Sequence, residues 1–377
     1  MSDAPPTAPT RWVLHVDLDQ FVAAVEVLRR PELAGLPVVV GGRGDPTERA
    51  VVSTASYEAR ELGVGSGMPL RLAVRKAPDA VFLPVDAPAY DAASAVVMEA
   101  LRAQRWDGVP VDVEVLGWDE AFVAQRSGER PGEGEGGGFP RERDRPRDPV
   151  AFAEQLRAAV LEASDLHCSV GIGNNKLQAK IATDFGKPRG VYTITDESWF
   201  EEMGERPTRA LWGIGAKTAK RLAGLGIDTV RQLAESDVRV LAAELGPTMG
   251  PWYHRLGRGV DSSPVDPQPY VPRAHGREET FQVDLEEWAD VEDAARRLTR
   301  RVVADIDAEG RPAARVGIKV RFKPFFTVTR SLTLPTPTND PDALAAAAVE
   351  LLGRVDQDRP VRLLGVRLEM TEPPGGY

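Results

Sequence analysis

The chain has 377 residues, of which 42% are hydrophobic and 28% are charged, and its formal net charge is −10. This length is enough for two or more domains, the composition is that of a soluble globular protein, and no apolar run approaches the ~18 residues of a membrane span. The single cysteine, Cys168, excludes an internal disulfide framework and fits a reducing cytosol, and its apolar surroundings indicate packing in a core strand. The acidic average argues against nucleic acid, but a basic surface on one domain can outweigh it.

Up to residue 190 the chain alternates between apolar strands and segments with helical spacing, which predicts an α/β layer. The first strand starts at Trp12. The other predicted strands are 37–40, 50–55, 81–85, 113–118 and 168–172, and the predicted helices are 21–30, 56–60, 70–76, 89–105, 149–166 and 176–185. The Pro-rich start predicts a disordered leader at 1–10, and a Gly-, Glu-, Arg- and Pro-rich stretch predicts a mobile surface loop at 126–148.

Two of the apolar runs lead into acidic residues. The first strand runs into Asp17 and Asp19, which share one face with His15, and the run 113–118 is followed by Asp119-Glu120. A buried carboxylate without a partner is strongly disfavoured, and a metal ion with oxygen ligands is the usual remedy. Neighbouring strand residues point to opposite faces, so this acidic pair can share a site only where its strand bends or ends. We expect the two acidic ends to meet around Mg²⁺.

From 199 to 259 the pattern changes to short helices. Residues 211–222 predict a helix–Gly-x-Gly–helix junction around Gly213 and Gly215, with Lys217 just behind. Glycines allow a sharp turn and expose amide N–H groups at a helix start, which is a natural phosphate site. This segment resembles a DNA-binding helix-hairpin-helix. The stretch 261–272, with four prolines, is a predicted linker.

The last segment predicts an α+β module. It has expected helices at 286–306 and 342–355 and expected strands at 315–323, 325–334 and 361–369. The strand 315–323 alternates apolar and basic residues, and six basic residues but no acidic ones lie between 311 and 330. Such a strand can lie along a phosphate backbone. Its candidate DNA contacts, with one from the next strand, are Arg315, Lys319, Arg321, Lys323 and Arg330.

Taken together, these motifs resemble a Y-family DNA polymerase of the polymerase IV type. The matching stretches, in family order, are 15–19, 54–60, 118–122, 170–176, 179–182, 187–190 and 212–215. The resemblance implies a multidomain right-hand polymerase. Its parts would be a palm at 11–24 and 86–190, small fingers at 25–85, a helical thumb at 191–260, the linker at 261–272, an α+β little finger at 273–370 and a tail at 371–377.

The resemblance also implies a function. The chain would extend a primer on a DNA template by two-metal phosphoryl transfer, in translesion synthesis and DNA repair. Two Mg²⁺ ions, for which Mn²⁺ can substitute, would be held by Asp17, Asp119, Glu120 and the carbonyl of Leu18. Implied nucleotide contacts are Thr54, Tyr57, Arg60 and Lys187 at the triphosphate, and Val51 and Ser53 above the nascent base pair. The implied partners are primer–template DNA and dNTP, for a monomeric, bacterial cytoplasmic enzyme at the nucleoid with no membrane contact.

Two departures from the family pattern carry hypotheses. Val22 stands where the family usually has Phe or Tyr as a steric gate under the sugar, which predicts poor discrimination against ribonucleotides. The tail at 371–377 lacks the usual sliding-clamp peptide, which predicts weak or absent clamp binding through it. Two alternative readings are a nucleotidyl cyclase, which would need no duplex grip, and a catalytically dead DNA-binding scaffold, which would be expected to lose its metal carboxylates.

Overall fold

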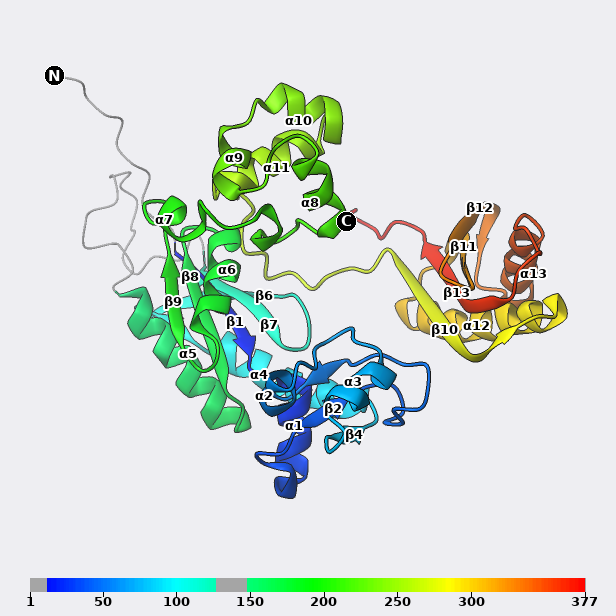
Figure 1. Cartoon of the computed structure of the whole chain (residues 1–377), viewed down its shortest axis with the longest axis horizontal. Helices are drawn as coiled ribbons and strands as arrows, with labels where there is room; N and C mark the ends of the chain where they lie inside the picture. Colours follow the sequence, from blue (N-terminus) through cyan, green and yellow to red (C-terminus); the bar gives the residue numbers. More distant parts are fainter. Residues whose placement is uncertain (1–11, 127–147, 377) are drawn as a thin grey trace. The chain divides into compact units, whose positions relative to one another are not determined.

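The computed structural model describes residues 12–126 and 148–376 (Figure 1). The predicted leader at 1–10 and nearly all of the predicted loop at 126–148 lie outside the described residues. The chain forms two compact units: one of residues up to 40 with 54–61 and 85–269, the other of 41–53, 62–84 and 270 onward. In the described ranges no helix combines the length and the apolar character that crossing a membrane requires.

The first unit is built on a six-stranded sheet in the order β5–β6–β7–β1–β8–β9, in which only the β8–β9 pair is parallel. Its strands are β1 (Val13–Leu18), β5 (Arg105–Trp106), β6 (Val109–Val115), β7 (Glu120–Gln125), β8 (Cys168–Gly173) and β9 (Val191–Ile194). β1 and β8 are buried almost throughout, which explains their nearly continuous apolar sequences. Cys168 is buried in β8, as predicted.

Helix α6 (Lys176–Gly186) packs closely on this sheet because β8 carries glycine at two facing positions. A Cβ atom on Gly171 would lie 2.0 Å from the carbonyl oxygen of Ala179. From the helix, Thr183 Oγ1 reaches His15 Nδ1 at 2.9 Å. Thus His15 faces α6, and by strand alternation Asp17 lies on the same side.

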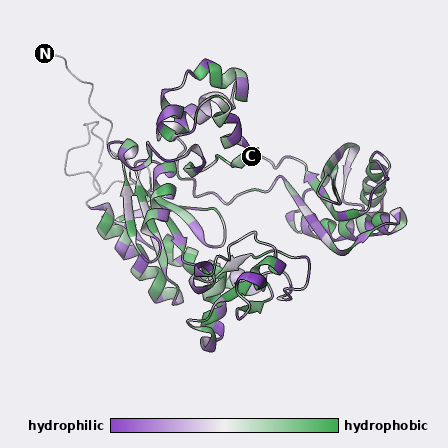
Figure 2. Cartoon of the chain, viewed as in Figure 1, coloured by the Kyte–Doolittle hydropathy of each residue, from purple (hydrophilic) through white to green (hydrophobic). Residues whose placement is uncertain are grey.

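Two longer helices, α4 (Ala87–Arg102) and α5 (Pro149–Ser164), pack against each other and against β6 and β8. Hydrophobic and hydrophilic residues alternate along α5 (Figure 2), as expected for a helix with one buried side. These helices and the sheet form the predicted α/β layer, which is therefore confirmed.

The predicted finger segment at 25–85 contributes to both compact units, so its boundaries stay a prediction. The elements in and next to it are α1 (Phe21–Arg29), η1 (Pro31–Leu33), β2 (Val38–Val40), β3 (Thr54–Ala55), α2 (Tyr57–Glu61), α3 (Leu70–Lys76) and β4 (Val81–Leu83). The predicted strand at 50–55 is too long. Only Thr54 and Ala55 pair with β2, because the backbone of Val52 bonds to Met68 and Val51 forms an isolated bridge to Pro69.

Short helices follow β9, as predicted. They are α7 (Trp199–Met203), η3 (Thr208–Ala210), α8 (Ala216–Ala223), α9 (Val230–Glu235), α10 (Val238–Leu245) and α11 (Met249–Gly257). The prediction of helix from Leu211 onward is wrong. Gly213 has φ +94°, which breaks the helix, and only a 3₁₀ turn precedes the Gly-Ile-Gly segment.

The predicted linker at 261–272 has no regular secondary structure, but its first half is packed. Val265 is buried against Val13, Phe122 and neighbouring small residues of the six-stranded sheet and α6. The N–H of Asp266 donates to a carboxylate oxygen of Glu114 in β6 at 2.7 Å. The first half of the linker is therefore anchored on the sheet.

The second unit contains a four-stranded antiparallel sheet in the order β10–β13–β11–β12. Its strands are β10 (Ala274–Leu285), β11 (Ala313–Phe322), β12 (Thr327–Thr338) and β13 (Val361–Met370), and its helices are α12 (Trp288–Glu309) and α13 (Pro341–Leu352). Both helices share one apolar core with one face of the sheet. The expected α+β module is confirmed, although strand β10 was not predicted.

Candidate active site

Three carboxylates lie where β1 ends and β7 begins. Asp17 of β1 is the register partner of Glu120, the first residue of β7. The N–H of Leu18 donates to the carbonyl oxygen of Asp119 at 2.8 Å. The two acidic segments therefore meet at one edge of two neighbouring strands, as the sequence predicts.

The acidic pair has a different place in its strand from the predicted one. β6 ends at Val115, and residues 116–119 form the turn of a hairpin whose second strand begins at Glu120. The pair therefore starts a strand instead of ending one. Because Asp119 lies in the turn, its side chain does not follow the alternation of faces along the strand. Asp119 and Glu120 therefore need not point to opposite faces.

The electrostatics of the three carboxylates differ. Burial raises the pKa of Asp17, and burial together with the neighbouring Glu120 charge raises the pKa of Asp119. In contrast, contact with His15 and the ammonium of Lys180 lower the pKa of Glu120 to about 2, against the effect of its own burial. Asp17 and Asp119 are thus the two carboxylates that a further positive charge would stabilise most.

Two lysines form ion pairs with these carboxylates. Lys187 Nζ is 3.0 Å from Asp17 and 3.2 Å from Asp184, and Lys180 ion-pairs with Glu120. Within residues 12–126 and 148–376, no three or more His, Cys, Asp and Glu side chains are grouped so as to hold a metal ion. The donor set nevertheless fits a hard divalent cation, because it consists of carboxylate oxygens in an environment that raises the pKa values of two of them.

A second polar group lies beside the acidic centre and is organised by Asp19. This carboxylate, 4% exposed, accepts hydrogen bonds from the hydroxyl of Tyr57 (2.7 Å), the hydroxyl of Ser169 (2.9 Å) and the backbone N–H of Arg189 (2.9 Å). Burial and the bond to Asp19 raise the pKa of Tyr57. Asp19 was predicted to share a strand face with Asp17, without a role of its own, and it lies just past the end of β1. Its position two residues after Asp17 was the available signal.

The other predicted nucleotide contacts fall into two groups. In the first unit, Arg60 stacks over the Tyr57 ring at 5.1 Å and donates to the carbonyl oxygen of Ala55. Thr54 is the first residue of β3, which precedes α2, and the side chain of Val22 on α1 is buried, with 7% exposed. The remaining two residues, Val51 and Ser53, belong to the second unit.

The Gly-x-Gly segment leads into α8. The N-cap residue of α8 is Gly215, which has no side chain to accept a hydrogen bond from the first N–H groups of the helix. Lys217 lies exposed in the first turn. A Cβ atom on Gly213 would lie 2.6 Å from the ring of Trp252, so only glycine fits this turn. The amide groups at the start of α8 have the character expected of a phosphate site.

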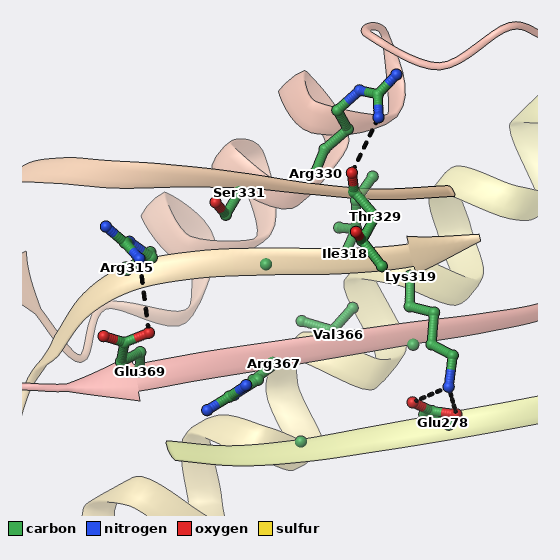
Figure 3. Close-up of a pocket in the computed structure, with 13 residues that line it drawn as sticks. Glu278, Arg315, Ile318, Lys319, Thr329, Arg330, Ser331, Val366, Arg367 and Glu369 are labelled. Carbon is green, nitrogen blue, oxygen red and sulfur yellow. Dashed lines mark hydrogen bonds and ion pairs between the residues drawn. The ribbon is translucent and has the colours of Figure 1, made fainter. Parts of the chain in front are cut away.

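In the second unit, the face of the four-stranded sheet opposite the helices forms a hollow of about 710 Å³ (Figure 3). Arg315 and Lys319 line it, and Arg321 follows on the same face of β11, where its Nε donates to Thr327 Oγ1 at 3.0 Å. Arg330 is the register partner of buried Ile318, so its side chain does not share this face. The alternation of β11 agrees with the prediction, since its apolar side chains are buried and its basic ones are not. Lys323 lies in the turn after the strand. Other lining residues are Gly276, Gly317, Thr329, Ser331, Gly365 and Arg367, of which Arg367 was missed.

This face is not purely basic, contrary to expectation. Glu278 of β10 binds Lys319 through both carboxylate oxygens at 2.9 Å, and Glu369 of β13 lies 3.9 Å from Arg315 (Figure 3). Both acids come from strands far from β11 in sequence. β13 lies next to β11, and Glu278 of β10 reaches Lys319 across Gly365 of β13, which the sequence of β11 could not reveal.

Comparisons with known proteins agree with this architecture. Residues 16–184 match the impB/mucB/samB family, residues 272–376 match the C-terminal domain of that family, and residues 209–261 match the thumb domain of DNA polymerase-iota. The chain is 48% identical to DNA polymerase IV 2 of Mycobacterium tuberculosis H37Rv, over 97% of this chain and 99% of that protein. It is 38% identical to DNA polymerase IV of Methanoculleus marisnigri, over 97% and 96% of the two chains.

Solved structures show the same likeness. A Y-family DNA polymerase chimera, Dbh-Dpo4(243-245)-Dbh, matches with a TM-score of 0.79 and 25% identity over 95% of this chain and 98% of that chain. An insertion ternary complex of Dbh DNA polymerase matches with a TM-score of 0.62 at the same identity and coverage.

Proposed function

Because the chain belongs to the Y-family DNA polymerases of the polymerase IV type, we propose which of its residues carry out nucleotide addition. It is a DNA-directed DNA polymerase of translesion synthesis. The observation that carries the assignment of residues is the meeting of Asp17, Asp119 and Glu120 at the edge of β1 and β7. The reading as a catalytically dead scaffold is not favoured.

Asp17, Asp119, Glu120 and the carbonyl of Leu18 are the proposed ligands of divalent cations. The raised pKa values of Asp17 and Asp119 support this proposal, since two crowded buried carboxylates gain most from a cation. We propose two Mg²⁺ ions, with Mn²⁺ as a substitute. When bound, they would activate the primer 3′ hydroxyl and stabilise the pyrophosphate leaving group.

The proposed substrates are primer–template DNA and an incoming nucleoside triphosphate. Lys187, Tyr57 and Arg60 would bind the triphosphate together with Thr54, since Lys187 already lies 3.0 Å from Asp17 and Arg60 is stacked on Tyr57. Cationic groups there offset the charge of the phosphates. Asp19 would keep the Tyr57 hydroxyl in place. Val51 and Ser53 are the proposed contacts of the nascent base pair.

Two further surfaces are proposed to hold DNA. One is the start of α8 with Gly213, Gly215 and Lys217, where backbone N–H groups can bind phosphate. The other is the open face of the four-stranded sheet with Arg315, Lys319 and Arg321, together with Lys323 in the turn after β11 and Arg330 on β12. Phosphate contacts of this kind fix position without reading sequence, which suits an enzyme that must act on any template.

Three finer properties remain proposals. Val22 leaves more room under the sugar than a ring would, so ribonucleotides would be accepted with poor discrimination. The tail from Thr371 onward lacks a clamp peptide, so clamp binding through it would be weak or absent. We further propose that the enzyme works as a monomer in the cytoplasm, at the nucleoid where its DNA substrate lies.

A single-nucleotide insertion assay tests the proposal. Primed templates that present each of the four bases are supplied with one dNTP at a time, with Mg²⁺ or with EDTA. Incorporation of the complementary nucleotide in Mg²⁺ and none in EDTA is expected. Incorporation that does not depend on the template base, or that persists in EDTA, would contradict it.

A further inference from the structure

Two side chains contact the same carboxylate oxygen of Glu120. Lys180 of α6 ion-pairs with Glu120 Oε2, and His15 Nε2 of β1 lies 3.3 Å from the same oxygen. Both contacts use Oε2, and no residue in the described ranges hydrogen-bonds Oε1. The carboxylate is thus fixed through one oxygen, and the other is left for a ligand.

The groups that hold Glu120 are themselves fixed. His15 is 1% exposed, its Nδ1 is 2.9 Å from the hydroxyl of Thr183, and its ring packs edge-on against Phe122 at 4.9 Å. Lys180 projects from α6, which the small residues of β8 allow to approach the sheet closely. A carboxylate bound by such anchored partners loses rotational freedom before any cation arrives.

Besides Glu120 and His15 Nε2, which is 3.3 Å away, Lys180 contacts a residue of the proposed thumb. Its Nζ lies 5.5 Å from the centre of the Trp212 ring, within the range of a cation–π interaction. Trp212 also packs against Phe122, at 6.0 Å, and immediately precedes Gly213 of the proposed phosphate site. One ammonium group therefore contacts both a candidate metal ligand and the residue next to a candidate DNA contact.

The neighbouring lysine provides a built-in comparison. Lys176, one helical turn earlier, ion-pairs with Glu114 and lies 5.4 Å from the centre of the Phe122 ring. Like Lys180 it pairs with a glutamate and lies near an aromatic ring, but Lys180 is also 3.3 Å from His15 Nε2, and Glu114 accepts the N–H of Asp266 and is no candidate ligand. A role in packing alone would be shared by both lysines, whereas a role at the cation site belongs to Lys180.

We propose that Lys180 is a positioning residue, which presents Glu120 Oε1 to the catalytic cation and couples that carboxylate to Trp212. The inference rests on the proposed function of Glu120. Partners that orient a metal ligand from outside typically change metal affinity or activity by about 10- to 100-fold when they are removed. Removal of Lys180 should therefore weaken cation binding without any loss of the ligand itself.

The test compares Lys180→Met, Lys180→Arg and the control Lys176→Met. Binding of Mn²⁺ is measured from the EPR signal of the free ion, with full-length protein, dideoxy-terminated primer–template and dNTP, so no turnover is needed. We expect Lys180→Met to weaken Mn²⁺ binding about tenfold, Lys180→Arg to restore most of it and Lys176→Met to stay within twofold of wild type. Circular dichroism checks folding, and if Lys180→Met does not fold, Lys180→Ala, which also removes the ammonium, replaces it with the same expected loss.

A double-mutant cycle tests the connection to the thumb. If Lys180 couples Trp212 to Glu120, the effects of Lys180→Met and Trp212→Ala on Mn²⁺ binding will be smaller together than their sum. Wild-type affinity in Lys180→Met, an equal loss in Lys176→Met, or additive effects would overturn the inference. Such results would leave the proposed function standing if wild type still extends primers in Mg²⁺, and failure of that extension would instead refute the function.

Discussion

The ion pair between Glu278 and Lys319 is predicted to limit how tightly the open sheet face holds DNA. The Glu278 carboxylate binds Lys319 Nζ through both oxygens at 2.9 Å and so competes with any phosphate for this ammonium. Glu278→Gln removes the competing charge and keeps the size of the side chain. Lys319 is then free to contact the backbone, so affinity for duplex DNA should rise.

The size of the effect follows from the exposure of the pair. The side chains of Lys319 and Glu278 are 33% and 48% exposed, so their pairing contributes at most about 1 kcal/mol. Releasing Lys319 should therefore tighten DNA binding about two- to fivefold at low salt. One additional phosphate contact should also steepen the slope of log K against log salt by about 0.9.

Fluorescence anisotropy with a labelled primer–template, between about 50 and 200 mM salt, measures both quantities. Glu350→Gln is the matched control, because it changes the net charge equally but lies on α13, where Glu350 pairs with Arg354. If Glu350→Gln changes affinity and slope as much as Glu278→Gln does, the effect is one of net charge and the reasoning is refuted. An unchanged slope in Glu278→Gln would refute it as well.

Three further variants have defined outcomes. Val22→Phe should raise the ratio of dNTP to rNTP insertion efficiency by about tenfold or more, because a ring meets the 2′-OH; strong rejection of rNTP by wild type would contradict this. Gly171→Ala should lower the free energy of unfolding by about 3 kcal/mol, since its Cβ would lie 2.0 Å from the Ala179 carbonyl; a loss under about 1 kcal/mol in urea denaturation would show that α6 can move away. Tyr90→Phe removes the 2.7 Å hydrogen bond to Glu26, a carboxylate 1% exposed, and should cost about 1.5–3 kcal/mol in the same assay; full stability would mean that other donors suffice.

The acidic centre was predictable because its signals are local. Asp17 stands at the end of an apolar strand, and Asp119-Glu120 lie beside another apolar run. That these segments pair follows from the strand order, which the resemblance to a known family implied. The place of Asp119 in a hairpin turn was not predictable from hydropathy, since the turn residues Leu116 and Trp118 are themselves apolar.

The partners of the site residues could not be predicted. Glu278 lies on β10, which escaped detection because most of its residues are polar and half-buried or exposed, and it reaches β11 only across Gly365 of β13. Lys180 was recognised as part of a motif, but its contact with Trp212 joins two segments that sequence patterns treat separately. Side-chain partners of this kind depend on tertiary packing, whereas strand faces and helix spacing depend on local alternation.

The most direct test of the central claim is the rate of single-nucleotide insertion by Asp119→Ala. Asp184→Ala is the control, because Asp184 also contacts Lys187 but is 75% exposed and lies outside the acidic centre. With DNA binding unchanged, Asp119→Ala is predicted to reduce the insertion rate by about 10³-fold or more, and Asp184→Ala by much less. Wild-type insertion by Asp119→Ala would contradict the assignment of these carboxylates as the reaction centre.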